Sequence, residues 1–404
     1  MKQRFIGPFW YPMLTMMLFL ALPPLFGSFL DDEKRWLWLI LFSFSCSFTL
    51  MPPVMWAAHR WGALDYPGGR RDHEDPTPRL GGVAVALSFY TALLLNGSLT
   101  PALLSIIIAS LIIIVVGVLE DVFGVREWIR LLAQTAAFVV VVLGGVVLQL
   151  FQPTTIGNIF NYTITFLWIV GITNAMNFID GMNGLASGVS IIIGVFLAVI
   201  AGQTGQVELG LLSIALFAAT AGFIPYNFLP GKKARSFLGD GGSSFLGFVL
   251  ASLAVLGEWA DNDPLVSFST PLIIFGILIY DTTYTTIARI VGGKVKNLRE
   301  LVAFVGHDHI HHRMNNIIGN KNLAVTFILL LNVILGLGTL ALRSANFFIA
   351  LIMVIQALFT FLLITVLEIG AKIRYNTTHR PGDRHGTAHT GDGENDVPGH
   401  PDGQ

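Results

Sequence analysis

The chain alternates long apolar segments with polar loops, and nearly all of its basic residues fall in every second loop. A helix of about 20 apolar residues crosses a bilayer core, so the sequence predicts about twelve spans, with ten or eleven left open because several segments are short. The expected spans are residues 9–30, 36–58, 80–96, 99–119, 129–150, 160–178, 185–202, 208–228, 241–257, 268–291, 322–342 and 347–368. With the first terminus placed inside, 21 of the 24 Lys and Arg residues lie on one side. This positive-inside asymmetry predicts that the basic face is cytoplasmic.

Composition supports an all-α, polytopic membrane protein, because 53% of the residues are hydrophobic and only 12% are charged. We expect one membrane domain over residues 1–375 and a disordered cytoplasmic tail over 376–404, which has too few apolar residues to bury a core. The basic start Met1–Arg4 precedes an apolar run without a small-residue cleavage site, so we expect a retained helix. Cys46 is the single cysteine, which excludes disulfides and thiolate metal sites. No nucleic-acid partner is expected.

Carboxylates gather at the predicted inner face. Glu120 and Asp121 directly follow an apolar run, and adjacent carboxylates repel one another unless they share a cation or a proton. A solvated helix end is the alternative, with Arg126 and Arg130 near enough to neutralise the pair. Asp240 lies in a glycine-rich turn that opens a predicted helix, where backbone N–H groups suit a phosphate and the carboxylate suits a bridging cation.

Amide side chains end the span 160–178. Asn174 and Asn177 are one helical turn apart on the same side, just before the segment Asp180–Gly184. Polar groups at the end of an apolar span are costly unless they bind something polar, and Gly181 and Gly184 permit a close approach of the backbone to a ligand. A structural N-cap role for Asp180 is the alternative.

Histidines gather in the segment His307–Arg313. Zinc is one candidate ligand, but hard carboxylates elsewhere on this face favour magnesium held by oxygen atoms, with histidine and arginine contacting phosphate. Arg313 can grip phosphate through two parallel hydrogen bonds.

Two further groups of charges have structural alternatives. The first inner loop, Asp65–Gly82, contains Arg71 and Arg79 and is equally well explained as a positive-inside anchor. Asp281 lies inside the span 268–291, with Arg289 two turns along the same face. A buried ion pair between them is at least as good an explanation as catalysis.

Taken in order, these segments resemble the polyprenyl-phosphate N-acetylhexosamine-1-phosphate transferases, glycosyltransferase family 4, which includes WecA, TagO and MraY. The paired carboxylates, the NxxNxxDG segment, the GDGGS turn and the HxHH segment each match a family motif, and the histidine segment is closer to the WecA and TagO branch. Glu120 replaces the first aspartate of the family's pair, and Asn183 replaces the second aspartate of its DGxDG motif. The second change puts in doubt any role of that position as a metal ligand or base.

The resemblance implies transfer of a sugar 1-phosphate from a UDP-N-acetylhexosamine to undecaprenyl or another polyprenyl phosphate, with release of UMP, at the bacterial inner membrane with the active site facing the cytoplasm. It implies Mg²⁺ as the cofactor, with Mn²⁺ as a possible substitute. The implied metal ligands are Asn177 and Asp240. The implied catalytic residues are Glu120, Asp121, Asp180, His309, His311 and His312. The implied substrate-binding residues are Arg71, Asn174, Gly181, Met182, Asn183 and Arg313.

The main alternative is a multi-spanning secondary transporter, since about twelve spans are common in that class. Transporters usually place ionisable residues near the middle of the membrane at the interface between repeats. Here Asp281 is the one candidate, and no internal repeat is evident. The sequence leaves open which sugar is carried, which polysaccharide is made and whether the protein forms a homodimer.

Overall fold

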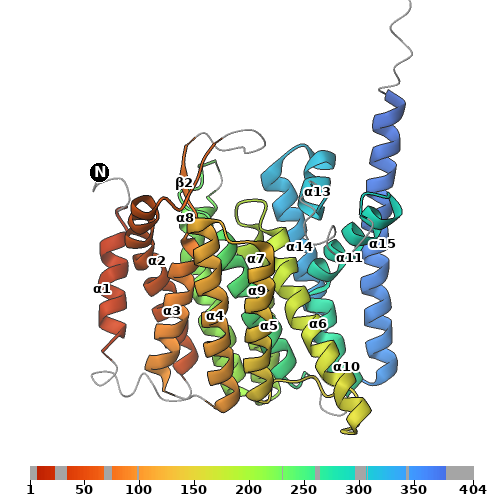
Figure 1. The fold of residues 1–404 in the computed structure, drawn as a ribbon, viewed down its shortest axis with the longest axis horizontal. Helices are drawn as coiled ribbons and strands as arrows, with labels where there is room; N and C mark the ends of the chain where they lie inside the picture. The colour runs from red at the N-terminus through yellow and green to blue at the C-terminus, as the bar shows by residue number, and fades with distance from the viewer. Residues whose placement is uncertain are drawn as a thin grey trace, which may run out of the picture. The chain divides into compact units, whose positions relative to one another are not determined.

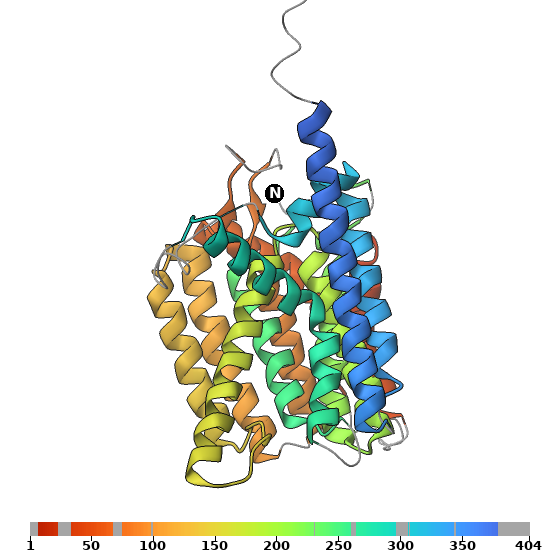
Figure 2. The ribbon, with the colours of Figure 1, turned by 90° about the vertical axis from the view of Figure 1, so that its right-hand side faces the viewer.

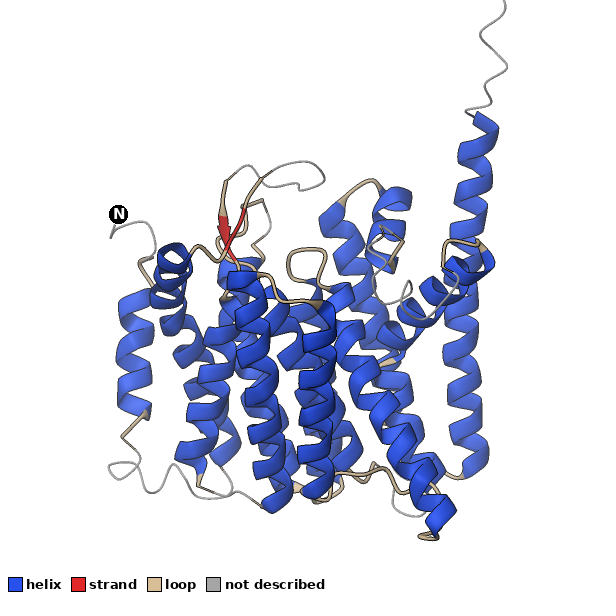
Figure 3. Ribbon diagram, in the orientation of Figure 1, coloured by secondary structure: helices blue, strands red, loops and turns tan. Residues whose placement is uncertain are grey.

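A computed structural model describes the chain over residues 7–22, 34–67, 75–97, 100–229, 231–259, 264–295, 306, 308–342 and 345–378, without the side chains of 264–266 and 372–378. Helices make up nearly all of its regular structure (Figures 1 and 3). They are α1 (Trp10–Leu20), α2 (Arg35–Trp61), α3 (Gly81–Asn96), α4 (Pro101–Phe123), α5 (Glu127–Leu143), α6 (Thr155–Ile179), α7 (Leu185–Gln203), α8 (Val207–Asn227), α9 (Gly239–Leu256), α10 (Pro264–Ile274), α11 (Gly276–Val291), α13 (Ile310–Ile318), α14 (Lys321–Thr339) and α15 (Phe347–Thr378). The expected helical membrane protein is therefore confirmed.

Each of the twelve predicted apolar segments contains a helix. Within the described residues, eight helices are long and apolar enough to cross a membrane. Helices α10 and α11 add a ninth span if they are counted together as one broken helix. The chain bends by 68° between them (Figure 2). Two more apolar helices, α1 and α3, are shorter, with 11 and 16 residues. The predicted span 268–291 is thus interrupted at Phe275, directly before Gly276 and one helical turn after Pro271.

Helix α9 lies at the centre of the bundle and packs against α3, α4 and α6. Of its most apolar stretch, 89% is buried. Glycines allow the close packing: a methyl group on Gly82 would overlap the backbone of Gly242, and one on Gly117 would overlap that of Gly241. The first turn of α9 is therefore held against α3 and the last turns of α4. This packing brings Asp240 close to the Glu120–Asp121 pair.

The first inner loop contains the only strands found in the described residues, β1 (Leu64–Asp65) and β2 (Thr77–Pro78), which pair antiparallel. Backbone hydrogen bonds join the end of this hairpin to the loop before α9. Phe237 N–H donates to Pro78 (2.7 Å), and Gly82 N–H donates to the carbonyl of Leu238 (2.8 Å). The hairpin, the start of α3 and the start of α9 are thus fixed to one another at one end of the bundle.

The chain divides into two units, residues 1–361 and residues 362–404, and the described part of the second unit is the end of α15. This helix continues to Thr378, three residues past the domain boundary expected from composition. Truncation after Thr378 should leave turnover and thermal stability unchanged, because the removed residues have almost no apolar side chains to pack. Assay of the purified truncated protein tests this, and loss of turnover in folded protein would reveal a contribution of the tail.

Candidate active site

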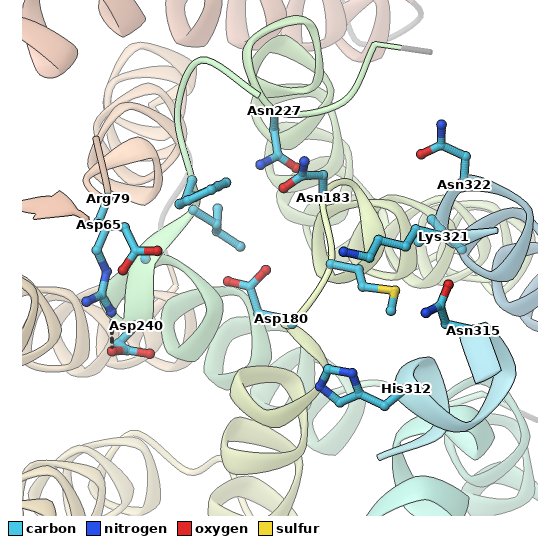
Figure 4. Close-up of a pocket in the computed structure, with 16 residues that line it drawn as sticks. Asp65, Arg79, Asp180, Asn183, Asn227, Asp240, His312, Asn315, Lys321 and Asn322 are labelled. Atoms are coloured by element: carbon cyan, nitrogen blue, oxygen red, sulfur yellow. Dashed lines mark hydrogen bonds and ion pairs between the residues drawn. The ribbon is translucent and has the colours of Figure 1, made fainter. Parts of the chain in front are cut away.

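A cavity of about 560 Å³ opens among the loops at the end of the bundle where α9 begins. Its lining residues come from the first inner loop, the α6–α7 turn, the loop before α9 and the α13–α14 region (Figure 4). They are Asp65, Arg79, Asp180, Gly181, Met182, Asn183, Asn227, Phe237, Leu238, Gly239, Asp240, His312, Asn315, Lys321, Asn322 and Val325. Asp65, Arg79 and Asp240 lie on one side of the cavity, while His312, Asn315 and Lys321 lie across it. Segments far apart in the sequence thus build one polar chamber.

Arg79 joins Asp240, in the first turn of α9, to Asp121, near the end of α4. Its guanidinium lies 2.9 Å from the Oδ2 atom of Asp240 and 3.3 Å from the Oδ1 atom of Asp121. Burial alone would lower the pKa of Arg79, but the charges of Asp121 and Asp240 raise it above its ordinary value. The arginine therefore stays charged and offsets the repulsion between the two carboxylates.

Asp121 is turned inward, toward the backbone of α9. Its side chain is 1% exposed, and its two oxygens accept hydrogen bonds from the N–H groups of Asp240 and Gly241, both at 3.1 Å. These N–H groups at the helix start were expected to suit a phosphate, and that expectation is wrong for these two, because Asp121 already occupies them. Gly239 makes the contact possible: its φ is +81°, and a Cβ atom there would crowd Asp121.

The side chain of Asp240, by contrast, is 34% exposed and faces the cavity. Its Oδ1 atom accepts a hydrogen bond from the amide of Asn177 at 3.0 Å, and the same amide donates to Ser243. Asn177 therefore ties the end of α6 to the first turn of α9.

Glu120 is connected through Arg130 to the Oδ1 atom of Asn177, whereas Asp240 contacts the amide nitrogen of Asn177. The Oε1 atom of Glu120 is 3.2 Å from Arg130, which also lies 3.5 Å from the Oδ1 atom of Asn177. The Oε2 atom of Glu120 is buried and makes no hydrogen bond with the described residues. Of the two arginines expected to neutralise the carboxylate pair, Arg130 does so for Glu120.

Asn174 lies one turn earlier on α6 and pairs with Gln134 of α5, donating at 2.9 Å and accepting at 3.3 Å. It stands behind Asn177 and away from the wall of the cavity. The two amides therefore share one helix side, as expected, but have different partners.

The α6–α7 turn forms the middle of the cavity wall. Asp180 follows Ile179, the last residue of α6, and is the C-cap of that helix, while the N-cap of α7 is Gly184. The structural N-cap role considered for Asp180 is therefore wrong. Burial raises the pKa of Asp180 well above its ordinary value, and the charges of Asp240 and Asp121 raise it further.

The histidine segment divides between the cavity and the helices behind it. His312 lines the cavity. His311 is 1% exposed and packs on Gly181, where a methyl group would overlap its ring. His309 lies 2.8 Å from Asp281, and Arg313 lies over the ring of Tyr284 at 4.0 Å from its centroid. Of the described residues in this segment, His312 is thus the one placed to touch a ligand in the cavity.

Comparison with known proteins decides the family. Residues 103–258 match the model of glycosyl transferase family 4. A Bacillus subtilis protein named a probable undecaprenyl-phosphate N-acetylglucosaminyl 1-phosphate transferase is 33% identical over 80% of this chain and 88% of its own length. The chain belongs to glycosyl transferase family 4.

Other relatives of the chain are also named as transferases. A decaprenyl-phosphate N-acetylglucosaminephosphotransferase of Mycolicibacterium smegmatis is 29% identical over 70% of this chain and 75% of its own length. A phospho-N-acetylmuramoyl-pentapeptide-transferase of Limosilactobacillus reuteri is 30% identical over 67% of this chain and 87% of its own length. These relatives are named as transferases, so family 4 membership supports an enzyme and gives the transporter alternative no support.

Within this family 4 protein, the predicted site residues divide into three sets. Those that line the cavity are Asp180, Gly181, Met182, Asn183, Asp240 and His312. Those that support it from the adjoining helices are Glu120, Asp121, Asn174, Asn177, His309, His311 and Arg313. Arg71 lies outside the described residues.

Sequence reasoning missed several residues of the cavity. Arg79 was not singled out within the first inner loop, for which a positive-inside anchor was an equally good explanation, although it lies two residues before Gly81, where α3 starts. Asn315, Lys321 and Asn322 follow the histidine segment and match no motif. Asn227 accepts a hydrogen bond from the N–H group of Gly184 at 2.6 Å and so fixes the α6–α7 turn. These positions became apparent only when the loops were brought together in space.

Proposed function

We propose that this family 4 protein transfers an N-acetylhexosamine 1-phosphate group from a UDP-sugar to a polyprenyl phosphate and releases UMP. The observation that carries the proposal is the cavity at the end of the bundle, where Asp240, Arg79 and His312 face one space (Figure 4). The names of the relatives from Bacillus subtilis and Mycolicibacterium smegmatis support N-acetylglucosamine as the sugar. An oxygen of the lipid phosphate attacks the β-phosphorus of the UDP-sugar, which carries the sugar. The bond from this phosphorus to the bridging oxygen breaks, and UMP leaves with that oxygen.

The donor atoms fit a magnesium ion that also contacts substrate. No group of three His, Cys, Asp or Glu side chains within the described residues forms a metal site by itself. Mg²⁺ is usually held by one or two carboxylates together with substrate phosphates and water, which agrees with the half-exposed Asp240. Asn177 supplies the second ligand if its amide turns over, because this exchanges the oxygen and the nitrogen beside Asp240.

A bound divalent ion would neutralise charge on the UDP pyrophosphate that otherwise repels the lipid phosphate. Arg79 adds positive charge beside Asp240, and His312 contacts the pyrophosphate from the opposite wall. Asp121 holds the first turn of α9 in place and thereby orients Asp240. Glu120, next to Arg130, positions the lipid phosphate. A phosphate monoester is largely ionised near neutral pH, so positioning by Glu120 is enough and no general base is required.

The active site faces the cytoplasm in this proposal. The cavity is lined by Arg79 and Lys321, and Arg130 lies beside Glu120 and Asn177 behind it, on the predicted basic side. The positive-inside rule assigns such a face to the cytoplasm. The protein would act as a multi-pass enzyme of the bacterial inner membrane in cell-envelope polysaccharide biosynthesis.

Turnover should require an added divalent cation. Treatment with EDTA should abolish UMP release, and Mg²⁺ or Mn²⁺ should restore it, because the candidate ligands are hard oxygen atoms. The measurement is UMP release by detergent-solubilised protein after chelation and addition of single metals. Restoration by Zn²⁺ alone would instead assign the metal to the histidine segment.

The sugar should be identified by the lipid product. Membranes containing the protein are incubated with a panel of UDP-sugars, and the lipid fraction is analysed by mass spectrometry. We expect a polyprenyl diphosphate carrying N-acetylglucosamine as the main product. A product that carries N-acetylgalactosamine would change the sugar but keep the reaction. If membranes that contain the folded protein form no lipid-linked sugar from any UDP-sugar, the proposed function is contradicted.

A further inference from the structure

A largely buried row of hydrogen-bonded polar side chains connects α11 to the segment before α13. The carboxylate of Asp281 lies 2.8 Å from the Nδ1 atom of His309, whose Nε2 atom lies 3.4 Å from Arg289. Arg289 in turn makes two hydrogen bonds to Asp308, at 2.9 and 2.6 Å. Asp281 is 2% exposed and His309 is 8% exposed. Such a buried network is costly unless each member has its partner.

The partners determine which nitrogen of His309 carries the proton. A guanidinium can only donate hydrogen bonds, so the Nε2 atom of His309 accepts from Arg289. The Nδ1 atom therefore carries a proton and donates a hydrogen bond to Asp281. Both ring nitrogens of His309 are used within the protein, which removes His309 from direct contact with a substrate phosphate.

Asp281 also holds the first turn of α13. Its Oδ1 atom accepts the backbone N–H of Ile310 at 2.5 Å and lies 3.5 Å from the guanidinium of Arg313. The N-cap residue, His309, makes no capping hydrogen bond with its own side chain. Since the first N–H groups of a helix have no partner within the helix, Asp281 supplies the missing cap from a neighbouring helix.

Helix α13 carries His312, the residue of this segment that lines the cavity. His312 lies two residues after Ile310 and one before Arg313, so the contacts of Asp281 lie on both sides of it in the chain. The break between α10 and α11 allows α11 to take a direction different from that of α10, bent by 68°. Asp281, in the second turn of α11, is thereby placed at the start of α13.

We propose that Asp281 is a positioning residue of the transfer reaction, which, through His309 and the first turn of α13, fixes His312 toward the substrate. This inference rests on the proposed function. It assigns His309 to support and His312 to substrate contact, and so divides a motif whose members the sequence alone treats alike.

A double-mutant cycle tests the proposal. Asp281→Asn and His312→Gln are measured singly and together by UMP release in full-length protein. Loss of a residue that orients a ligand-contacting side chain typically costs about 10- to 100-fold in activity, and we expect such a loss in kcat/KM for each single variant. Because Asp281 acts through His312, the double variant should be no more than about threefold below the weaker single variant.

Asn161→Ala is the matched control. Asn161 is also a buried side chain that accepts backbone N–H groups from outside its own helix, at 3.1 and 3.0 Å, but it lies near the start of α6, distant in sequence from the site residues at the helix end. Combined with His312→Gln, its effects should multiply. If the loss of kcat/KM in the Asp281→Asn, His312→Gln double variant is also near the product of the two single losses, Asp281 only stabilises the fold in general, and the proposal is overturned.

Hydrogen–deuterium exchange gives a readout that does not depend on turnover. Asp281→Asn should speed amide exchange in peptides covering Ile310–Met314 by about tenfold or more, while peptides of α9 stay unchanged. Unchanged exchange at α13 would overturn the proposal. If wild-type protein releases no UMP from any UDP-sugar, the proposed function fails, whereas the exchange result still decides whether Asp281 holds α13.

Asp308→Asn provides a second variant if Asp281→Asn does not fold. The side chain of Asp308 is 25% exposed, so its replacement is easier to tolerate. Burial would raise the pKa of Asp308, but its hydrogen bonds and ion pair with Arg289 lower it, so the carboxylate stays ionised. Asp308→Asn loosens this end of the row, so its loss of kcat/KM should also not multiply with that of His312→Gln. A double variant whose loss equals the product of the two single losses would count equally against the proposal.

Discussion

Asp240→Asn is expected to reduce turnover by at least about a hundred- to a thousandfold while the protein still inserts and folds. Asp240 is the exposed carboxylate at the start of α9, with Arg79 at 2.9 Å and Asn177 at 3.0 Å. Loss of one charged group at the place where phosphoryl charge is stabilised costs roughly this factor. Asparagine still accepts the hydrogen bond from Asn177, so the local structure should persist. The measurement is UMP release at saturating Mg²⁺, together with the midpoint of thermal unfolding.

Asp65→Asn is the matched control, because it removes a second carboxylate from the wall of the same cavity. We expect a loss of less than about tenfold, since Asp65 is not among the proposed metal ligands. Near-normal turnover of Asp240→Asn at saturating Mg²⁺ would remove Asp240 from the metal site. Equal large losses for both variants would mean that total negative charge, and not a particular ligand, is what the cavity requires.

Two substitutions of Glu120 distinguish the effect of its charge from the effect of its side-chain length. Glu120→Asp should retain substantial activity, because it restores the family's usual side chain and keeps the charge. Glu120→Gln should be far more damaging, because it removes the negative charge that faces Arg130 at 3.2 Å. Shortening the side chain by one methylene carries its own cost, since a misplacement of about 1 Å can reduce a rate roughly a hundredfold. Turnover of both variants at saturating UDP-sugar gives the comparison.

Similar, near-normal rates for the two Glu120 variants would identify Glu120 as a structural partner of Arg130 with no part in turnover. The function of the pair would then rest on Asp121, whose oxygens hold the first turn of α9. A loss in Glu120→Asp larger than that in Glu120→Gln would show that reach outweighs charge, and would indicate that Arg130 cannot follow the shorter side chain.

The helices were predictable because hydrophobic length and composition largely determine where a span can lie. The expected spans 185–202 and 208–228 differ by one residue at most at each end from α7 and α8. Where the prediction was less accurate, a local backbone feature decided the outcome. Helix α5 ends at Leu143, before Gly144 and Gly145, and not at residue 150 as expected. The predicted span 268–291 breaks at Phe275, directly before Gly276, which a count of apolar residues does not detect.

The candidate site was predictable only in its motifs. Asp240 and the Asp180–Asn183 turn have characteristic sequence contexts, and both line the cavity. The choice of partners was not predictable, because it depends on how α3, α4 and α9 pack. Arg79 bridges two aspartates distant in sequence, and Asp121 occupies the N–H groups that were expected to bind phosphate.

Charge spacing within one helix was also an incomplete guide. Asp281 and Arg289 were considered as partners because they lie on one face of α11. The described contacts connect Asp281 to His309 and Arg289 to Asp308. The segment before α13 thus supplies nearer partners than the helix itself does.

The central claim is tested most directly by UMP release from UDP-N-acetylglucosamine in the presence and absence of polyprenyl phosphate. Purified protein in detergent is assayed with Mg²⁺, and UMP and the lipid-linked sugar are quantified in the same reaction. The proposed transfer predicts that UMP appears only when both substrates are present, in a one-to-one ratio with a polyprenyl diphosphate-linked sugar. Release of UMP without the lipid product, or no release from properly folded protein supplied with both substrates, would contradict it.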